Sequence, residues 1–219
     1  MEMRNNRGGN MISNGECKYC KKVIFAIAMS KHLLACGKKI NKEGGKDIFL
    51  IRASAGPFFV YFEINIDDTL KKIDGFLRSL WLECCGHLSA FTINNIRYYS
   101  NCKDSEPNEK TMNSKLSQLL SVNLNFFHEY DFGTTTHLNL KVIEKRKGSL
   151  SNIELIARNN LPEFKCGCGK VAKEICSQCA EEETWLLCSG CAKNHECEDE
   201  MLLPVINSPR MGMCAYTGD

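Results

Sequence analysis

The sequence predicts an α+β fold, in which a central domain with a mixed or antiparallel sheet and one main helix is flanked by two small cysteine-rich modules. Three observations lead to this prediction. Residues 48–160 contain several β-branched and aromatic segments with partial alternation, and an amphipathic helical segment lies between the early ones. A group of cysteines with a histidine precedes this region. A denser group follows it.

The composition is that of an ordinary globular protein with an unusual number of cysteines. The 219 residues, of which 43% are hydrophobic and 25% charged, allow one core of medium size and small appendages. Fourteen residues are cysteines, and their clustering beside histidines indicates metal sites in a reducing compartment rather than a secreted disulfide scaffold. Residues 1–15 lack the apolar core of a signal peptide, and no segment has the roughly 20 continuous apolar residues that span a bilayer. We therefore expect a cytoplasmic protein without membrane contact.

The N-terminal cysteine group has the spacing of one zinc finger. Cys17 and Cys20 are separated by two residues, as in a hairpin knuckle, and His32 and Cys36 lie four residues apart on one face of a predicted helix. The ligand order resembles that of Cys-Cys-His-Cys fingers. We predict these four residues as zinc ligands.

The small core of this finger is predicted to consist of Phe25, Met29 and Leu33. Residues 1–46 hold ten Lys and Arg against three acidic residues, so contact with nucleic acid is plausible through residues 17–46. One finger reads about three base pairs, which is too few for specificity alone.

The central elements follow a Gly-containing linker at residues 41–46. Strands are predicted at 48–51 and 58–66, followed by a helix that Thr69 could cap and that extends to about Cys85. Residues 88–93 and 96–99 form a predicted hairpin around Asn94 and Asn95, residues 101–113 a loop, and 114–121 a short helix. Further strands are predicted at 124–132, 137–144 and 153–158.

Residues 127–133, which read Phe-His-Glu-Tyr-Asp-Phe-Gly, carry a resemblance to a known family. Together with the preceding helix and the strand that begins at His87, they resemble the plasmid pRiA open-reading-frame-three-like family, whose members also occur as passenger proteins of insertion elements. The resemblance covers roughly residues 48–160 and implies a fold and a prokaryotic source, but no established activity. The family usually continues with an acidic residue, a Trp and a His, whereas this chain has three threonines and then His137.

The same turn contains candidate acid–base residues. His128, Glu129, Asp131 and His137 lie near it, and carboxylates with histidines can transfer protons. Strand alternation places His128 and Tyr130 on one face and Glu129 and Asp131 on the other, which argues against a single site. Asp131 is more simply a turn former that binds its own backbone. We therefore predict no catalytic residue and no organic cofactor site.

The C-terminal cysteine group supplies eight metal ligands in 32 residues. They form four pairs: Cys166 and Cys168, Cys176 and Cys179, Cys188 and Cys191, and His195 and Cys197. Because zinc takes four thiolate or imidazole ligands, four pairs imply two ions. Sequential wiring would join the first pair to the second, whereas a cross-brace would join the first to the third and the second to the fourth. The order of pairs resembles B-box and related cross-brace fingers, and we favour the cross-brace.

Four cysteines are left outside these two modules. Cys84 and Cys85 are adjacent, so they cannot easily converge on one ion, and we interpret them as buried free thiols at the end of a helix. Cys102 and Cys214 are unpaired in this interpretation. The total prediction is three structural zinc ions. Ten thiolates and three zinc ions would change the formal charge from +2 to about −2, which does not indicate a globally basic nucleic-acid binder.

The predicted organisation has five parts: a disordered N-terminus at 1–14, the finger at 15–40, the α+β domain at 47–160, the two-zinc module at 164–200 and a tail at 201–219. Metal sites that are filled by protein ligands favour a non-catalytic binding module with a protein or nucleic-acid partner. The alternative is a nucleic-acid-processing enzyme associated with mobile elements that uses the turn at 128–137. The partner and the oligomeric state stay open.

Overall fold

The computed structural model describes residues 13–37, 45–101, 110–179 and 185–218. Its N-terminal elements are β1 (Asn14–Cys17), β2 (Val23–Phe25) and α1 (Ala26–Gly37). The central elements are β3 (Lys46–Ala55), β4 (Phe58–Asn65), α2 (Leu70–Leu77) with a π-helical continuation (Arg78–Leu82), β5 (Ser89–Ile93), β6 (Ile96–Tyr99), β7 (Lys110–Thr111), α3 (Leu116–Leu119), β8 (Asn125–Tyr130), β9 (Thr136–Gly148) and β10 (Glu154–Asn159). The C-terminal elements are β11 (Glu174–Cys176), β12 (Leu186–Leu187), α4 (Ser189–Ala192), a 3₁₀ turn (Asp199–Met201) and β13 (Leu202–Pro204).

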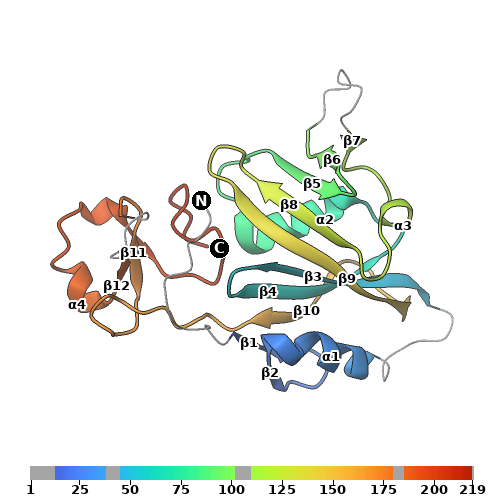
Figure 1. The fold of residues 1–219 in the computed structure, drawn as a ribbon, viewed down its shortest axis with the longest axis horizontal. Coiled ribbons are helices and arrows are strands. Elements are labelled where there is room, and N and C mark those ends of the chain that lie inside the picture. Colours follow the sequence, from blue (N-terminus) through green and yellow to red (C-terminus); the bar gives the residue numbers. More distant parts are fainter. Residues whose placement is uncertain (1–12, 38–44, 102–109, 180–184, 219) are drawn as a thin grey trace.

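The fold is α+β, as the sequence predicts. Within the described residues, the large sheet has ten strands in the order β2-β1-β10-β4-β3-β9-β8-β5-β6-β7. All neighbours are antiparallel except β6 and β7, and a separate three-stranded sheet has the order β12-β11-β13. Figure 1 shows the small sheet and α4 at one end of the molecule and the N-terminal hairpin and α1 beside β10.

Strand β4 is the centre of the packing because both of its faces are covered. Phe58, Val60 and Phe62 face a core that includes residues of α2, whereas Phe59 and Tyr61 face a second core with Met29 and Leu33 of α1. This explains why residues 58–64 form a continuous buried run instead of an alternating one. The finger is thus packed on the sheet, and β1 extends the sheet by pairing with β10.

Several element boundaries differ from the sequence predictions. The helix after Thr69 ends at Leu82 rather than Cys85, and Thr69 makes no side-chain cap hydrogen bond. Lys110 and Thr111, predicted as loop, pair in parallel with β6, and β9 continues to Gly148. The predicted hairpin turn is confirmed: Asn94 and Asn95 both have positive φ, as a two-residue hairpin turn requires. Residues 1–12 and 102–109 lie outside the described parts, as do most residues of the predicted linker at 41–46.

The segment after β13 packs onto the central domain. Met211 belongs to the main core, and Ser208 Oγ donates a hydrogen bond of 2.7 Å to the carbonyl oxygen of Trp81 at the end of α2. Figure 1 shows this dark red segment between the small sheet and the large one. The tail predicted at 201–219 therefore contributes a strand, β13, to the small sheet and buried side chains to the domain. No helix in the described parts is both long and apolar enough to cross a membrane.

Candidate metal centres

The N-terminal group converges as the spacing predicts. The ligand atoms of Cys17, Cys20, His32 and Cys36 all lie within 4.8 Å of one another. A tight turn between β1 and β2 brings the first two together, with Lys21 at positive φ and its N–H donating to the carbonyl oxygen of Cys17 at 2.8 Å. Helix α1 supplies the other two, and His32 Nε2 lies 3.2 Å from Cys20 Sγ and 3.4 Å from Cys36 Sγ.

The small core of this finger differs from the prediction at one residue. Met29 and Leu33 are fully buried, but Phe25 is 56% exposed. The reason is strand alternation: in β2, Ile24 turns toward the core and both of its neighbours turn outward. Tyr19 replaces the missing aromatic contact, and its hydroxyl donates a hydrogen bond of 2.7 Å to Glu63 on β4.

The C-terminal ligands group in the interleaved order. Cys166, Cys168, Cys188 and Cys191 form one cluster, whose atoms lie within 4.8 Å of one another, so the first pair joins the third. In the first pair, a single residue separates Cys166 from Cys168. A turn at Gly169 holds this pair: Gly169 has φ +83°, and its N–H donates to the carbonyl oxygen of Cys166.

The second and fourth pairs form the other C-terminal cluster, whose ligand atoms also lie within 4.8 Å of one another. Its members are Cys176, Cys179, His195 and Cys197. Cys179 Sγ lies 3.6 Å from both His195 Nε2 and Cys197 Sγ. Because the two clusters alternate along the chain, they tie residues 166–197 into one cross-braced unit.

The distances fit tetrahedral metal sites and not disulfides. Two thiolates at about 2.3 Å from one zinc ion are separated by about 3.7 Å in a tetrahedron, and a thiolate and an imidazole nitrogen by about 3.5 Å. Cys168 Sγ lies 3.6 Å from both Cys166 Sγ and Cys188 Sγ, whereas a disulfide bond is about 2.05 Å long. None of the thirteen cysteines in the described parts forms a disulfide.

The local electrostatics favour thiolates beside a cation. The backbone N–H of Cys191, in the first turn of α4, lowers the pKa of the Cys188 thiol to about 6. The Cys197 thiol raises the pKa of Cys179 to about 12, because neighbouring sulfurs cannot all ionise together in the absence of a positive charge. A divalent cation would remove that conflict.

A fourth group of the same kind contains cysteines that we predicted to be isolated. Cys84, Cys85, His87 and Cys214 also place their ligand atoms within 4.8 Å of one another. The prediction of buried thiols at a helix end is wrong, because the helix ends at Leu82 and Cys85 is exposed. The sequence signal for this cluster is the run Cys84-Cys85-Gly86-His87, which supplies three of its four ligands. The C-terminal segment supplies the fourth, Cys214. Cys102 lies outside the described parts.

The candidate acid–base residues do not form one site. His128 is buried and its Nε2 lies 2.8 Å from Asp74 Oδ1, whereas Glu129 is on the opposite face with Arg97 at 2.6 Å and His137 at 3.6 Å. Asp131 has positive φ and accepts a hydrogen bond from the Gly133 N–H at 3.0 Å, as a turn former does. The predicted separation of His128 from Glu129 is confirmed, but Asp131 does not share the face of Glu129: it is buried beside Arg210, whose guanidinium lies over the Tyr130 ring.

Asp131 has a second role that we did not predict. Its Oδ2 accepts a hydrogen bond of 2.6 Å from Arg210, which is completely buried in the C-terminal segment. Burial by itself would raise the pKa of the Asp131 carboxyl, but the Arg210 guanidinium outweighs this effect and holds the pKa below its ordinary value.

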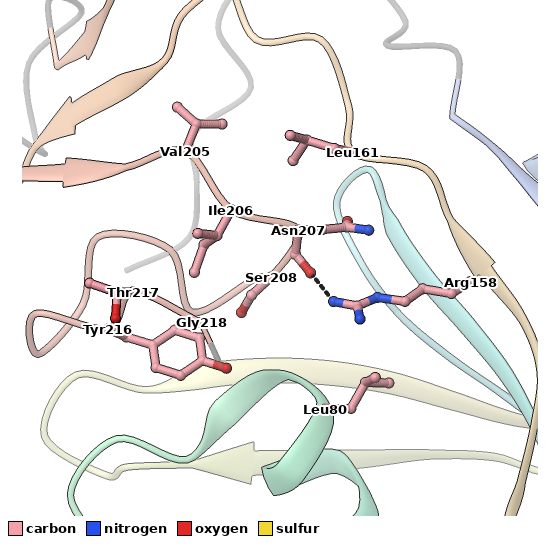
Figure 2. Close-up of a pocket in the computed structure, with 10 residues that line it drawn as sticks. All are labelled: Leu80, Arg158, Leu161, Val205, Ile206, Asn207, Ser208, Tyr216, Thr217 and Gly218. Carbon is pink, nitrogen blue, oxygen red and sulfur yellow. Dashed lines mark hydrogen bonds between the residues drawn. The ribbon is translucent and has the colours of Figure 1, made fainter.

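Two open cavities lie beside the C-terminal segment and the cross-braced unit. The first, of about 290 Å³, lies between the segment and the domain, where Arg158 Nη2 donates a hydrogen bond of 2.6 Å to the carbonyl oxygen of Asn207 (Figure 2). Its walls combine aliphatic side chains, among them Leu161 and Ile206, with polar ones such as Ser208. The second, of about 730 Å³, borders the ligands Cys179, Cys191 and His195. Glu196 and the ligand Cys197 also line this second cavity.

The finger also presents an exposed apolar face. Val23 and Phe25 of β2 are 58% and 56% exposed, and Ile27 at the start of α1 is 97% exposed. Lys21, Lys22 and Lys31 are exposed on the same finger. Because β2 is an edge of the large sheet in the described residues, this face is available for contact.

No family model matches this chain, and no curated protein matches it. Among solved structures, the chain is similar to the crystal structure of a protein of unknown function, MM3350 from Methanosarcina mazei Go1. That similarity has a TM-score of 0.43 at 10% sequence identity and covers 52% of this chain and 68% of that one.

Proposed function

We propose that this chain is a non-catalytic, zinc-stabilised binding module. The observation that carries the proposal is the completeness of the three clusters that the sequence predicts: each supplies four protein ligands from cysteine and histidine. Structural zinc sites are closed in this way, whereas catalytic sites keep one position for water or substrate. Thiolate sites of this kind persist in a reducing compartment such as the cytoplasm. In this proposal, Cys17, Cys166 and Cys176 each belong to a separate structural zinc site.

The partner surface in this proposal is the apolar face formed by Val23, Phe25 and Ile27. Large apolar side chains that are next to one another and more than half exposed are uncommon on a surface without a partner. Aromatic and aliphatic side chains of this type form the centres of protein–protein interfaces, with charged groups at their rim. A protein partner is therefore the first candidate.

Nucleic acid is the second candidate, favoured by the exposed lysines of the same finger. Lys21, Lys22 and Lys31 can contact phosphates, but Lys21 already lies 3.4 Å from Glu16. The kinship of residues 48–160 with the plasmid pRiA family, and through it a link to mobile elements, is part of the same proposal. The enzyme alternative would need the polar groups near 128–137 to act together, and they are dispersed.

A photo-crosslinking experiment tests the partner surface. A photoreactive phenylalanine analogue is placed at Ile27 and, as a matched control, at Phe127, which is 51% exposed and lies on β8, separated from β1 by four strands of the large sheet. After irradiation in producing cells, adducts are identified by mass spectrometry with and without nuclease treatment. We expect a protein adduct that is specific to position 27 and is weakened when Phe25→Ser is introduced. Equal adducts at both positions would overturn the proposed surface, and a nuclease-sensitive adduct would select nucleic acid.

A further inference from the structure

We propose that Cys84, Cys85, His87 and Cys214 hold a fourth zinc ion, which fastens the C-terminal segment to the turn between the π-helical continuation of α2 and strand β5. The four ligand atoms meet the same 4.8 Å limit as the three clusters discussed above. Cys214 Sγ lies 3.6 Å from His87 Nε2, the same separation as between Cys179 Sγ and His195 Nε2. A tetrahedral zinc ion separates a sulfur and a nitrogen ligand by about 3.5 Å.

The backbone between α2 and β5 explains how adjacent cysteines can converge. The π-helical turn ends at Leu82 and Glu83 is extended, so Cys84 and Cys85 are not in a helix. Gly86 follows with φ +72°, and its N–H donates a hydrogen bond of 2.6 Å to the Glu83 carboxylate. This turn reverses the chain and brings His87 back beside the two cysteines.

The fourth ligand arrives on a backbone that is bent unusually. Cys214 and Ala215 have φ of 49° and 52°, which is uncommon for two successive residues that are not glycine. Contacts of the preceding residues hold this bend in place: Ser208 bonds to the Trp81 carbonyl, and Arg210 donates 2.7 Å to the carbonyl of Thr134. Strained backbone of this kind gathers at ligand sites.

The surroundings suit a thiolate site with a net negative charge. Arg210 Nη2 lies 3.3 Å from Cys214 Sγ and 3.5 Å from Cys84 Sγ, so the buried guanidinium can donate to two of the sulfurs. Three thiolates and one neutral histidine on Zn²⁺ carry a charge of about −1, which the guanidinium, shared with Asp131, offsets in part. Asp131 Oδ2 lies 3.6 Å from His87 Nε2 and 3.9 Å from Cys214 Sγ, and Tyr130 Oη 3.8 Å from Cys84 Sγ.

This site differs from the other three in its exposure. Each of the other clusters contains at least one buried cysteine, whereas Cys85 and Cys214 are exposed and Cys84 is only half-buried. A chelator or an oxidant therefore reaches this cluster more readily than the others. The ion that fastens the C-terminal segment is the one that exchanges first.

Native mass spectrometry of the zinc-loaded full chain tests this site by differences between variants. We expect Cys214→Ser and Cys85→Ser each to hold one zinc ion fewer than the wild type. Cys102→Ser, which removes a cysteine outside the four described clusters, should hold the wild-type number. Circular dichroism verifies that each variant is folded, and Cys85→Ser, at an exposed ligand, guards against a misfolded Cys214→Ser.

Three results would overturn the fourth site. One is an unchanged zinc number in both folded variants. Another is a denatured wild type whose mass without reductant is two hydrogens lower than its mass with reductant, while Cys214→Ser shows no such difference. That result would identify a redox-active disulfide instead of a zinc site. The third is equal loss of zinc from Cys102→Ser. If the wild type binds three zinc ions instead of four, the fourth site is overturned but the three structural sites of the proposed function are not. Failure of the fourth site can therefore be distinguished from failure of the proposed function.

Discussion

Cys214 Sγ lies 3.6 Å from His87 Nε2, although 127 residues separate them in the chain. This contact places the C-terminal segment beside the turn that precedes β5 and next to the ion pair of Asp131 and Arg210. The segment is thus part of the central domain, and it connects that domain to the cross-braced unit through β13.

Zinc release from the exposed cluster should precede release from the other three. When a chelator such as EDTA is added to the zinc-loaded chain, we expect a first fast phase of one ion per chain. Hydrogen exchange followed by mass spectrometry should then show faster exchange in residues 208–216, because the segment loses one attachment, while β3 and β4 stay protected. A single release phase, with exchange rising equally in the finger, would contradict this order.

How much of this arrangement the sequence could predict depends on the separation of the residues along the chain. The finger and the cross-braced unit were predictable because all their ligands lie within 20 and 32 residues, at spacings that a knuckle and a short helix impose. The fourth cluster was not, because no local spacing indicates that Cys214 returns to residues 84–87. Its position depends on tertiary contacts such as that of Ser208 with Trp81.

The same limit explains the other differences. Phe25 was predicted to be in the finger core because a helical period includes it, but it belongs to strand β2, where Ile24 faces inward. The α+β class was predictable from alternation within single strands. The addition of β1 to the sheet was not, because it depends on pairing with β10, which is more than 130 residues away.

Packing of the finger on the sheet predicts different effects for two residues of helix α1. Leu33→Ala should lower the free energy of unfolding by about 2–5 kcal/mol, because it leaves a cavity against Leu50 and Tyr61. Ile27→Ala, at a residue that is 97% exposed, should change it by less than about 0.5 kcal/mol. Urea unfolding monitored by tryptophan fluorescence measures both, because Trp81 lies in the central core and Trp185 packs against it. Equal effects would mean that the finger is not packed as described.

The buried network around Asp74 predicts a large effect for a small substitution. Asp74 accepts hydrogen bonds from Ser89 at 2.7 Å and Arg78 at 2.7 Å, and lies 2.8 Å from His128. Removal of the buried Asp74 charge leaves Arg78 with the more exposed Glu83 as its ion-pair partner and removes the buried carboxylate beside His128. Asp74→Asn should therefore cost about 3–5 kcal/mol of unfolding free energy.

Asp68→Asn is the matched control for this substitution. Asp68 pairs with Lys72 across the same four-residue spacing, but both side chains are more exposed than those of Asp74 and Arg78. The control should cost no more than about 1 kcal/mol. Chemical denaturation at pH 7 compares the two variants, and a cost that is the same in both would show that burial does not determine the strength of this network.

Loss of one cross-brace site should unfold the small sheet and leave the large one intact. Cys179→Ser removes a ligand next to β11, so we expect hydrogen exchange in residues 174–176 to rise at least about tenfold, which corresponds to about 1.4 kcal/mol of lost local stability. Met211 and Leu203 also pack into the main core, so part of this change should extend to the C-terminal segment. Cys102→Ser is the control, and a protected small sheet in Cys179→Ser would argue against a metal at this cluster.

The most direct test of the metal centres is X-ray absorption spectroscopy at the zinc edge, combined with zinc quantification on the same reduced, full-length sample. We predict four-coordinate zinc with about three sulfur ligands at about 2.3 Å and about one nitrogen at about 2.0–2.1 Å. The same prediction includes four ions per chain, three in the proposed structural sites and one at Cys214. A folded protein that binds no zinc, or zinc surrounded mainly by oxygen, would contradict it.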